Sequence, residues 1–195
     1  MPSNIYCVVL AAGQSRRYGR TKLLEELDGK SLLRGTLETA QVACPGSVCL
    51  VTGHAADAVF DAARGLADLV AHNSDFETGL GSSIRCGVRA CRKNADAILM
   101  VLADQPLVTA THLVDLVASW DGNANGIVAS GYANTFGPPV LFGSAYFDRL
   151  ENLEGDVGAR QILRHNKAAI VAVRFEEASV DIDTPADLAA CPSRR

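Results

Sequence analysis

Short apolar runs alternate with longer amphipathic stretches along this chain. Residues 5–10, 47–51 and 97–102 are continuous β-favouring apolar runs, which are typical of strands buried on both faces. Weaker strand patterns cover residues 69–71, 126–130 and 168–173, and residues 137–142 form an extended stretch. Helical patterns fall at residues 31–42, 55–66, 82–92 and 110–120. This alternation predicts an α/β fold of the Rossmann-like, three-layer type, with a mainly parallel sheet covered by helices on both faces.

Composition and charge narrow the functional classes. The 195 residues suit one domain spanning 1–195, with 48% hydrophobic and 21% charged residues, as in ordinary globular proteins. A formal net charge of -4 gives no electrostatic reason to expect a nucleic-acid partner. The chain has no apolar run of roughly 18 residues, and residues 1–4 do not begin a signal peptide. We therefore expect a cytoplasmic protein that does not bind a membrane.

The cysteines and histidines do not suggest a structural metal centre. None of the six cysteines forms a CxxC pair, and several lie inside apolar segments, where cysteine packs as a small hydrophobe. The histidines are dispersed without metal-ligand spacing, so we assign them to the surface or to packing. They are His54, His72, His112 and His165.

The segment after the first predicted strand, residues 10–22, is the first candidate for ligand binding. Ligands of such sheets collect at the carboxyl ends of the strands. Arg16 and Lys22 can neutralise a polyphosphate, and small residues let backbone N–H groups approach it. The segment lacks the ending of a Walker A loop and the G-x-G-x-x-G of dinucleotide-binding folds. A flexible surface loop with solvated cations is the alternative. The small residues are Ala11, Ala12 and Gly13.

Two acidic positions are candidate metal ligands. Asp104 follows the apolar run at 97–102 and would project from the end of that strand. A turn-forming aspartate before Pro106 is the alternative reading. Asp183 lies in Val-Asp-Ile-Asp-Thr-Pro-Ala-Asp, residues 180–187, where it or Thr184 could cap a C-terminal helix. Carboxylates of this kind suit Mg²⁺.

Residues 10–22 follow the string Leu-Ala-Ala-Gly-x-Ser-x-Arg-x-Gly-x-x-Lys, which resembles the signature of the MobA-like NTP transferases. That family includes the molybdenum-cofactor cytidylyltransferases and guanylyltransferases, and sugar-phosphate nucleotidyltransferases are related. The Asp-Gln-Pro and C-terminal motifs resemble the family as well. The resemblance implies that Arg16, Lys22 and Asp104 are catalytic, that Asp104 and Asp183 bind Mg²⁺, and that Asp181 supports them. It also implies that the loop binds nucleotide through Leu10, Ala11, Ala12, Gly13, Arg16 and Lys22.

Two further segments resemble parts of the same family. Asn73 and Ser83, the latter within residues 79–84, are similar to the segment that lines the base and ribose pocket, although a glycine-started helix is the alternative. The Gly-Pro-Pro at 137–139 and residues 155–160 are similar to acceptor-side motifs of the cytidylyltransferases. A pair of Gly/Pro turns is the alternative there. The implied acceptor-binding residues are Gly137, Pro139, Asp156 and Arg160.

The resemblance also bears on the substrates. Guanylyltransferases of the family usually carry Leu-Ala-Gly-Gly, so Ala12 favours CTP over GTP. The implied reaction joins CMP to the terminal phosphate of molybdenum-bearing molybdopterin and releases pyrophosphate. A molybdenum hydroxylase or its maturation chaperone would receive the product. The alternatives are a guanylyltransferase, transfer to a sugar phosphate or an isoprenoid-precursor phosphate, and a non-catalytic carrier of the cofactor. A carrier has no evident need for Lys22 together with two carboxylates.

Overall fold

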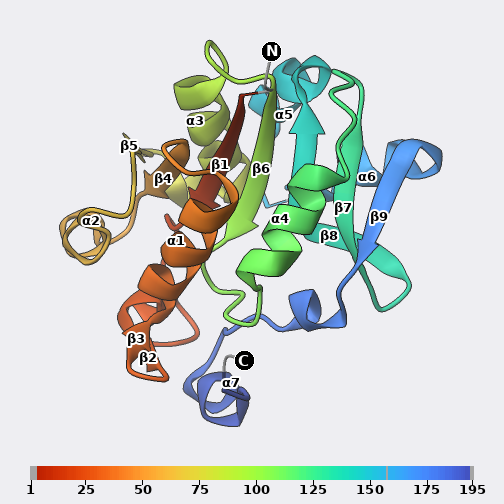
Figure 1. The fold of residues 1–195 in the computed structure, drawn as a ribbon. Coiled ribbons are helices and arrows are strands. Elements are labelled where there is room, and N and C mark those ends of the chain that lie inside the picture. The colour runs from red at the N-terminus through yellow and green to blue at the C-terminus, as the bar shows by residue number, and fades with distance from the viewer. Residues whose placement is uncertain (1–3, 157, 194–195) are drawn as a thin grey trace.

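A seven-stranded sheet runs through the computed structural model, which describes residues 4–156 and 158–193. The strands lie in the order β5-β4-β1-β6-β8-β7-β9 (Figure 1). Neighbours pair in parallel except at β8, which runs antiparallel to both β6 and β7. The bounds are β1 Ile5–Leu10, β4 Val48–Thr52, β5 Leu69–His72, β6 Ala97–Leu102, β7 Ile127–Tyr132, β8 Thr135–Gly143 and β9 Ile170–Arg174.

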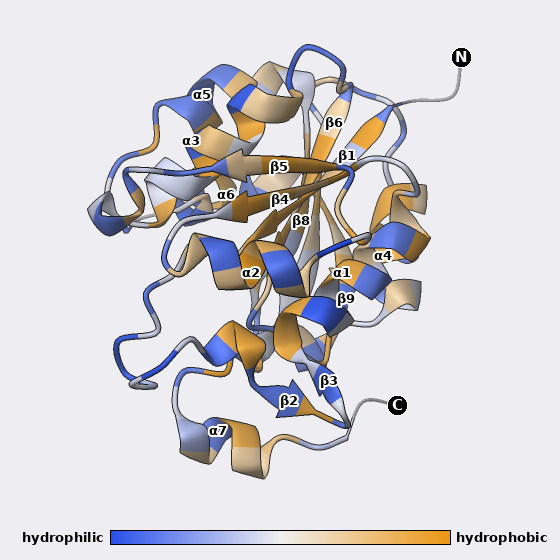
Figure 2. Cartoon of the chain, turned by 90° about the vertical axis from the view of Figure 1, so that its left-hand side faces the viewer, coloured by the Kyte–Doolittle hydropathy of each residue, from blue (hydrophilic) through white to orange (hydrophobic). Residues whose placement is uncertain are grey.

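Successive residues of the central strands belong to two different cores. In β1, Cys7 and Val9 pack on one face, Val8 and Leu10 pack on the other, and all four are buried. A strand points successive side chains to opposite faces, so a continuous apolar run is what a doubly covered sheet requires. Figure 2 shows apolar colour along β4 and β5 and alternating colour along the helices.

Helices cover both faces of the sheet (Figure 1). α1 and α4 pack against the core that contains Cys7, with α2 beside α1, whereas α3, α5 and α6 pack against the core that contains Val8. This confirms the predicted three-layer α/β architecture. The helix bounds are α1 Leu32–Ala43, α2 Ala56–Ala62, α3 Leu80–Cys91, α4 Ala110–Ala118, α5 Phe147–Glu151, α6 Arg160–His165 and α7 Pro185–Ala190.

Local hydrogen bonds set the ends of the longer helices. The Ser31 hydroxyl accepts a hydrogen bond from the Arg34 N–H (3.2 Å) at the start of α1. Thr109 caps α4 in the same way by accepting from the His112 N–H (3.2 Å). Beyond the end of α1, Gly46 adopts a φ of 75°, which turns the chain toward β4.

The predicted strands are confirmed to within about two residues at each end. The antiparallel direction of β8 was not predicted, because hydrophobic periodicity carries no information on strand direction. The hairpin of β2 (Glu26–Leu27) and β3 (Lys30–Ser31) and the short helices α5 and α6 were also missed, since they are too short to show a period. Five 3₁₀ helices within the described residues complete the structure: η1 Lys22–Leu24, η2 Phe76–Thr78, η3 Ser144–Tyr146, η4 Lys167–Ala169 and η5 Glu176–Ser179.

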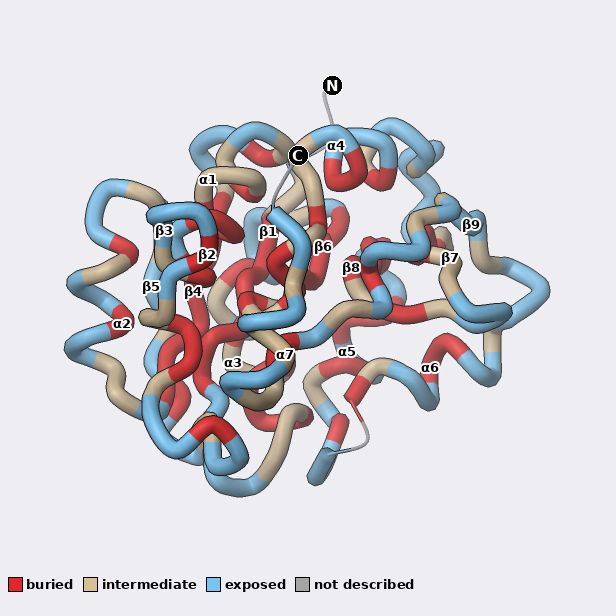
Figure 3. Tube along the Cα trace, turned by 90° about the horizontal axis from the view of Figure 1, so that it is seen from below, coloured by how far each residue is buried: buried red, intermediate tan, exposed pale blue. Residues whose placement is uncertain are grey.

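The carboxyl ends of the parallel strands meet at one edge of the sheet, which Figure 3 shows end on. The hairpin and α7 lie at this edge (Figure 1). Val157, part of the predicted acceptor-side motif, lies outside the described residues, as do residues 1–3 and 194–195. Among the helices that the structure describes, none has the length and apolarity to span a bilayer.

Candidate active site

The loop between β1 and η1 closes on itself. The Ser15 carbonyl accepts hydrogen bonds from the N–H groups of Tyr18 (2.9 Å) and Gly19 (3.1 Å), and Ser15 Oγ accepts one from the Lys22 N–H (3.2 Å). Gly19 has a φ of 82°, in the left-handed region that glycine adopts without strain. The closed turn brings Lys22 back to the cleft that Leu10 also lines.

Lys22 lies between two carboxylates that come from distant parts of the chain. Its Nζ is 2.8 Å from Oδ2 of Asp104 and 3.2 Å from Oδ1 of Asp183. Only 9% of Lys22 is exposed, so the surrounding structure holds the ammonium in place. The guanidinium of Arg17 lies 2.8 Å from the other carboxylate oxygen of Asp183. The fold thus brings together the three side chains that the sequence assigned to one centre.

A backbone hydrogen bond joins the two acidic segments. The Ile182 N–H donates to the carbonyl oxygen of Asp104 over 2.9 Å. Ile182 is fully buried in a small cluster with Tyr18 of the loop, Leu27 of the hairpin and Leu32 of α1. The cluster therefore couples the position of the C-terminal segment to that of the loop.

The start of α7 fixes the backbone on the other side of Asp183. The Asp187 N–H donates to Thr184 Oγ1 (3.3 Å), while Asp187 Oδ2 accepts from the N–H groups of Thr184 (2.7 Å) and Asp183 (3.0 Å). This is a capping box. Thr184 is therefore the helix cap, which leaves the Asp183 side chain directed at Lys22.

The charged groups of this centre shift the pKa values of Lys22 and of Asp181. Burial disfavours the charged form of Lys22, but the adjacent carboxylates of Asp104 and Asp183 outweigh burial and raise the pKa of the lysine. Asp181 keeps accessible surface. Its partly enclosed position, together with the negative charges of Asp104 and Asp183, still raises its pKa to about 6. At neutral pH Lys22 is therefore a cation bridging two carboxylates.

A cleft of about 500 Å³ lies over this centre. Its volume falls within the roughly 300–1,000 Å³ that is usual for small-molecule sites. Phe76, Glu77 and Leu80 form part of the wall, and the sequence carried no signal for the first two of these. The predicted site residues that line the cleft are Leu10, Ala11, Ala12, Gly13, Arg16, Lys22, Ser83, Asp104, Asp156 and Asp183.

Asn73 is buried behind this cleft and does not line it. Its amide nitrogen donates to the hydroxyls of Ser82 (2.9 Å) and Ser83 (3.1 Å), and its amide oxygen accepts from the Asp75 N–H (3.0 Å). Only 5% of the residue is exposed. Its contacts in this structure position Ser83, which does line the cleft.

A second cavity, of about 240 Å³, adjoins the cleft. Its wall is largely apolar, and Asp156 and Arg160 of the predicted acceptor residues line it. Gln105 also lines it, and Gln105 Oε1 is a buried acceptor without a hydrogen-bond partner in the described part of the chain. The two cavities share Leu10, Leu80, Leu102 and Asp156.

Gly137 and Pro139, predicted on the acceptor side, lie behind the wall of the second cavity. A Cβ at Gly137 would lie 1.9 Å from the hydroxyl of Tyr132, so only glycine leaves room for that ring. Tyr132 lines the cavity, as does Pro138. Pro139 is buried, and its carbonyl accepts a hydrogen bond from Ser130 Oγ (2.9 Å).

The two glycine-rich segments assigned to nucleotide and acceptor touch each other. The Gly81 N–H donates to the Gly155 carbonyl (2.9 Å). Gly79 has a φ of 109°, and a Cβ there would lie 2.6 Å from Oδ1 of Asp156. Glycine at this position lets the loop of Asp156 pack against the start of α3, where the two cavities join.

The arginine assignment in the loop needs a correction. When the signature string is laid on residues 10–22, its arginine position falls on Arg17 and not on Arg16. In the structure Arg17 pairs with Asp183, whereas the Arg16 side chain contacts the Gln14 side chain, which in turn donates to Glu77 (3.1 Å). Arg17 is therefore the arginine of the charged centre.

The chain is similar in sequence to several known proteins. The MobA-like NTP transferase domain family matches residues 7–170. The purine catabolism protein PucB of Bacillus subtilis is 34% identical in an alignment of 189 residues that covers 91% of this chain and 91% of its own. The molybdenum cofactor cytidylyltransferase of Escherichia coli is 24% identical over 98% of this chain and 97% of its own.

A solved structure extends the likeness to three dimensions. Rv0371c from Mycobacterium tuberculosis matches with a TM-score of 0.81 and 28% identity, covering 96% of this chain and 97% of that chain. Its complex with manganese matches with a TM-score of 0.78 and 27% identity over the same shares.

Proposed function

This chain belongs to the family of MobA-like NTP transferases, and from that premise we propose that it transfers CMP from CTP to the terminal phosphate of molybdenum-bearing molybdopterin. The observation that carries the proposal is the bridge from Lys22 to Asp104 and Asp183 at the bottom of the cleft. A cation between two carboxylates, beside a loop of small residues, is an arrangement suited to a metal-bound triphosphate.

Mg²⁺ suits the centre. One nitrogen atom touches an oxygen of each carboxylate, so a cation at this place would reach both Asp104 and Asp183. The described residues contain no group of three or more His, Cys, Asp or Glu side chains that could hold a metal. Two carboxylates, with phosphate oxygens and water as the other ligands, are how Mg²⁺ is commonly held. The bound metal would neutralise charge on the phosphates during transfer.

The loop and its cations would hold the triphosphate. Ala12 and Gly13 line the cleft, and their backbone N–H groups can donate to phosphate oxygens, whereas the Ala11 N–H already donates to the Val51 carbonyl (2.9 Å). With Asp104 and Asp183 holding the metal, the ammonium of Lys22 would be free to turn to the phosphates. Arg17 and Arg16 add positive charge on the same side of the cleft.

The transfer itself requires no protein nucleophile. An oxygen of the acceptor phosphate attacks the α-phosphorus in line, and the bond from that phosphorus to the pyrophosphate oxygen breaks. The apolar second cavity, which is lined by Gln105, the neighbour of Asp104 in the chain, would receive the ring system of the acceptor. Gln105 Oε1 offers an unused acceptor for an N–H group of that ring.

CTP is the proposed donor because Ala12 matches the cytidylyl members of the family. The relative in Escherichia coli is named a molybdenum cofactor cytidylyltransferase, which supports both the nucleotide and the acceptor. We place the reaction in the cytoplasm, where a molybdenum hydroxylase or its maturation chaperone would receive the product.

Pyrophosphate release tests the proposal. The purified protein is given molybdenum cofactor, Mg²⁺ and each of the four nucleoside triphosphates in turn, and CTP should react fastest. Asp104→Asn and Asp183→Asn should each lower turnover by about a hundredfold or more, because each removes a carboxylate that would hold the metal whose charge compensates the transferring phosphate. Asp57→Asn, on the exposed surface of α2, is the matched control and should react like wild type.

Two results would contradict the assignment. Wild-type rates in Asp104→Asn or Asp183→Asn would remove the carboxylates from the reaction. Faster reaction with GTP, together with greater protection from heat by GTP than by CTP at equal Mg²⁺, would reject the cytidylyl specificity.

A further inference from the structure

A third cavity, of about 210 Å³, continues the proposed acceptor site. It shares Tyr132, Arg160 and Leu163 with the second cavity and shares no lining residue with the nucleotide cleft. The three cavities therefore form a series, with the apolar second cavity in the middle. The third cavity is lined by Tyr132, Thr135, Phe136, Arg160, Leu163, Arg164 and Lys167.

Three cations line this cavity, and in the described part of the chain none of them pairs with an acid. Within residues 4–156 and 158–193, Arg160, Arg164 and Lys167 form no ion pair. Other cations of the described residues also form no ion pair, so what distinguishes these three is that they line one cavity. The arginines that do pair with an acid are Arg17, Arg20, Arg34, Arg64, Arg89, Arg92 and Arg174.

The placement of these cations costs the fold stability. Arg160 and Arg164 are four residues apart on α6, and like charges at that spacing repel each other. Lys167 follows in η4 and adds a third charge to the same cavity. A bound anion would relieve this repulsion.

We propose that Arg160, Arg164 and Lys167 bind a second anionic group of the acceptor, beyond the phosphate that reacts. The inference rests on the proposed function and narrows its substrate class. The acceptor is an elongated molecule with a phosphate near Asp104, an apolar or aromatic middle in the second cavity, and a compact oxyanion in the third. Phosphate, carboxylate and metal oxyanion groups share this chemistry.

A small aryl phosphate, which has a ring and an anionic group but no nucleoside, tests binding at this site separately from the transfer reaction. The protein is first saturated with CTP and Mg²⁺, and 1-naphthyl phosphate is titrated while its fluorescence is followed. 1-Naphthol and inorganic phosphate serve as probes for the ring alone and the anion alone. Wild type should bind 1-naphthyl phosphate at least about tenfold more tightly than either, since charged hydrogen bonds add to burial of the ring.

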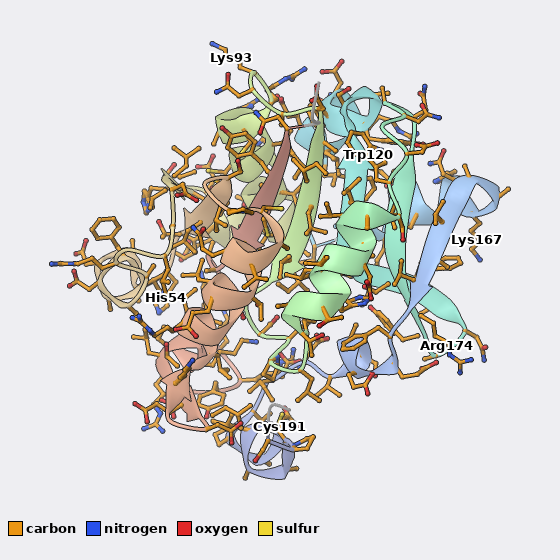
Figure 4. All side chains as sticks on the ribbon, viewed as in Figure 1. His54, Lys93, Trp120, Lys167, Arg174 and Cys191 are labelled. Atoms are coloured by element: carbon orange, nitrogen blue, oxygen red, sulfur yellow. The ribbon has the colours of Figure 1, made fainter. Side chains whose placement is uncertain are left out.

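The double variant Arg164→Gln with Lys167→Gln should bind 1-naphthyl phosphate about tenfold more weakly and 1-naphthol as before. The control is Arg64→Gln with Lys93→Gln, which removes the same charge elsewhere on the surface and should bind like wild type. Figure 4 shows Lys93 and Lys167 on different sides of the molecule. Protection from heat by CTP should be equal in all three proteins.

Three results would overturn the inference. If the control variant lost as much affinity for 1-naphthyl phosphate as the double variant, the loss would be a general effect of charge. Equal affinity for 1-naphthyl phosphate and 1-naphthol, or for 1-naphthyl phosphate and inorganic phosphate, would show that ring and anion are not bound together. Absence of protection by CTP in wild type would reject the proposed function instead, and the naphthyl titrations would still report on the third cavity.

Discussion

Replacing Lys22 with methionine should change stability, metal binding and turnover in different directions. In the metal-free protein the Lys22 ammonium contacts Asp104 at 2.8 Å and Asp183 at 3.2 Å. Methionine keeps the unbranched side chain and removes the charge. The two carboxylates then face each other without a cation between them.

The size of the effect follows from the distances and the exposure. The Coulomb energy between two opposite unit charges about 3 Å apart is about 5.5 kcal/mol at an effective dielectric constant of about 20 and about 1.4 kcal/mol in bulk water. The Asp104 and Asp183 side chains are 25% and 36% exposed, so the lower part of this range applies. After the cost of desolvating the lysine, we expect a loss of about 1–3 kcal/mol in the free energy of unfolding.

Metal binding should respond with the opposite sign. If Asp104 and Asp183 hold Mg²⁺ as proposed, the metal would have to displace the ammonium of Lys22 in wild type, whereas in Lys22→Met neither carboxylate is paired with a lysine. Calorimetric titration of the nucleotide-free variant should therefore show Mg²⁺ binding about tenfold tighter or more, which corresponds to about 1.4 kcal/mol. Turnover should nevertheless fall by about a hundredfold or more, because the phosphates lose a positive charge.

Lys30→Met is the matched control, since the Lys30 ammonium lies 2.6 Å from Glu38 on the surface and is 55% exposed. Its unfolding free energy should change by less than about 1 kcal/mol, with Mg²⁺ binding and turnover unchanged. Unaltered or weaker Mg²⁺ binding in Lys22→Met would refute the idea that the ammonium and the metal compete for one place. Wild-type turnover would refute its role in transfer.

Two further predictions concern other parts of the structure. Gly137→Ala should push the Tyr132 ring out of position and raise the KM for the acceptor while leaving protection by CTP unchanged; Gly131→Ala, where a Cβ meets no atom closer than 3.8 Å, should affect neither. Burial lowers the pKa of His112, so the fold favours its neutral form, and stability should be level above about pH 7 and fall as the pH drops through about 6.5. Urea unfolding at pH 7.5 and 5.5 should show a smaller loss in His112→Gln than in wild type, while His165→Gln, which is exposed, should behave like wild type.

The hydrophobic pattern of the sequence located the strands that are buried on both faces of the sheet. β1 and β6 were predicted to the residue, because each is a continuous apolar run that begins directly after a polar residue, Asn4 or Asp96. β8 was found only as an extended stretch, since its direction depends on pairing with β6 and β7 over distant contacts. Such pairing has no local signature in a single sequence.

The site was predictable where a motif names the residue, and otherwise depended on tertiary contacts. Lys22, Asp104 and Asp183 came from motifs, and the fold places them together. Asn73 shows the limit, because its motif indicated the nucleotide pocket while its side chain turns inward to the hydroxyls of α3. The pairing of Arg17 with Asp183 joins residues that are far apart in the chain, and neither local propensity nor charge pattern could reveal it.

The link between Ile182 and the Asp104 carbonyl gives the charged centre an order of assembly during translation. Lys22 and Asp104 leave the ribosome long before residues 180–187, so a nascent chain at first has only one of the two carboxylates that contact Lys22. The centre becomes complete when Ile182 enters its cluster and Thr184 starts the final helix. Cleavage between Arg174, where β9 ends, and Asp183 would therefore remove one carboxylate of the centre and leave every strand of the sheet in the chain.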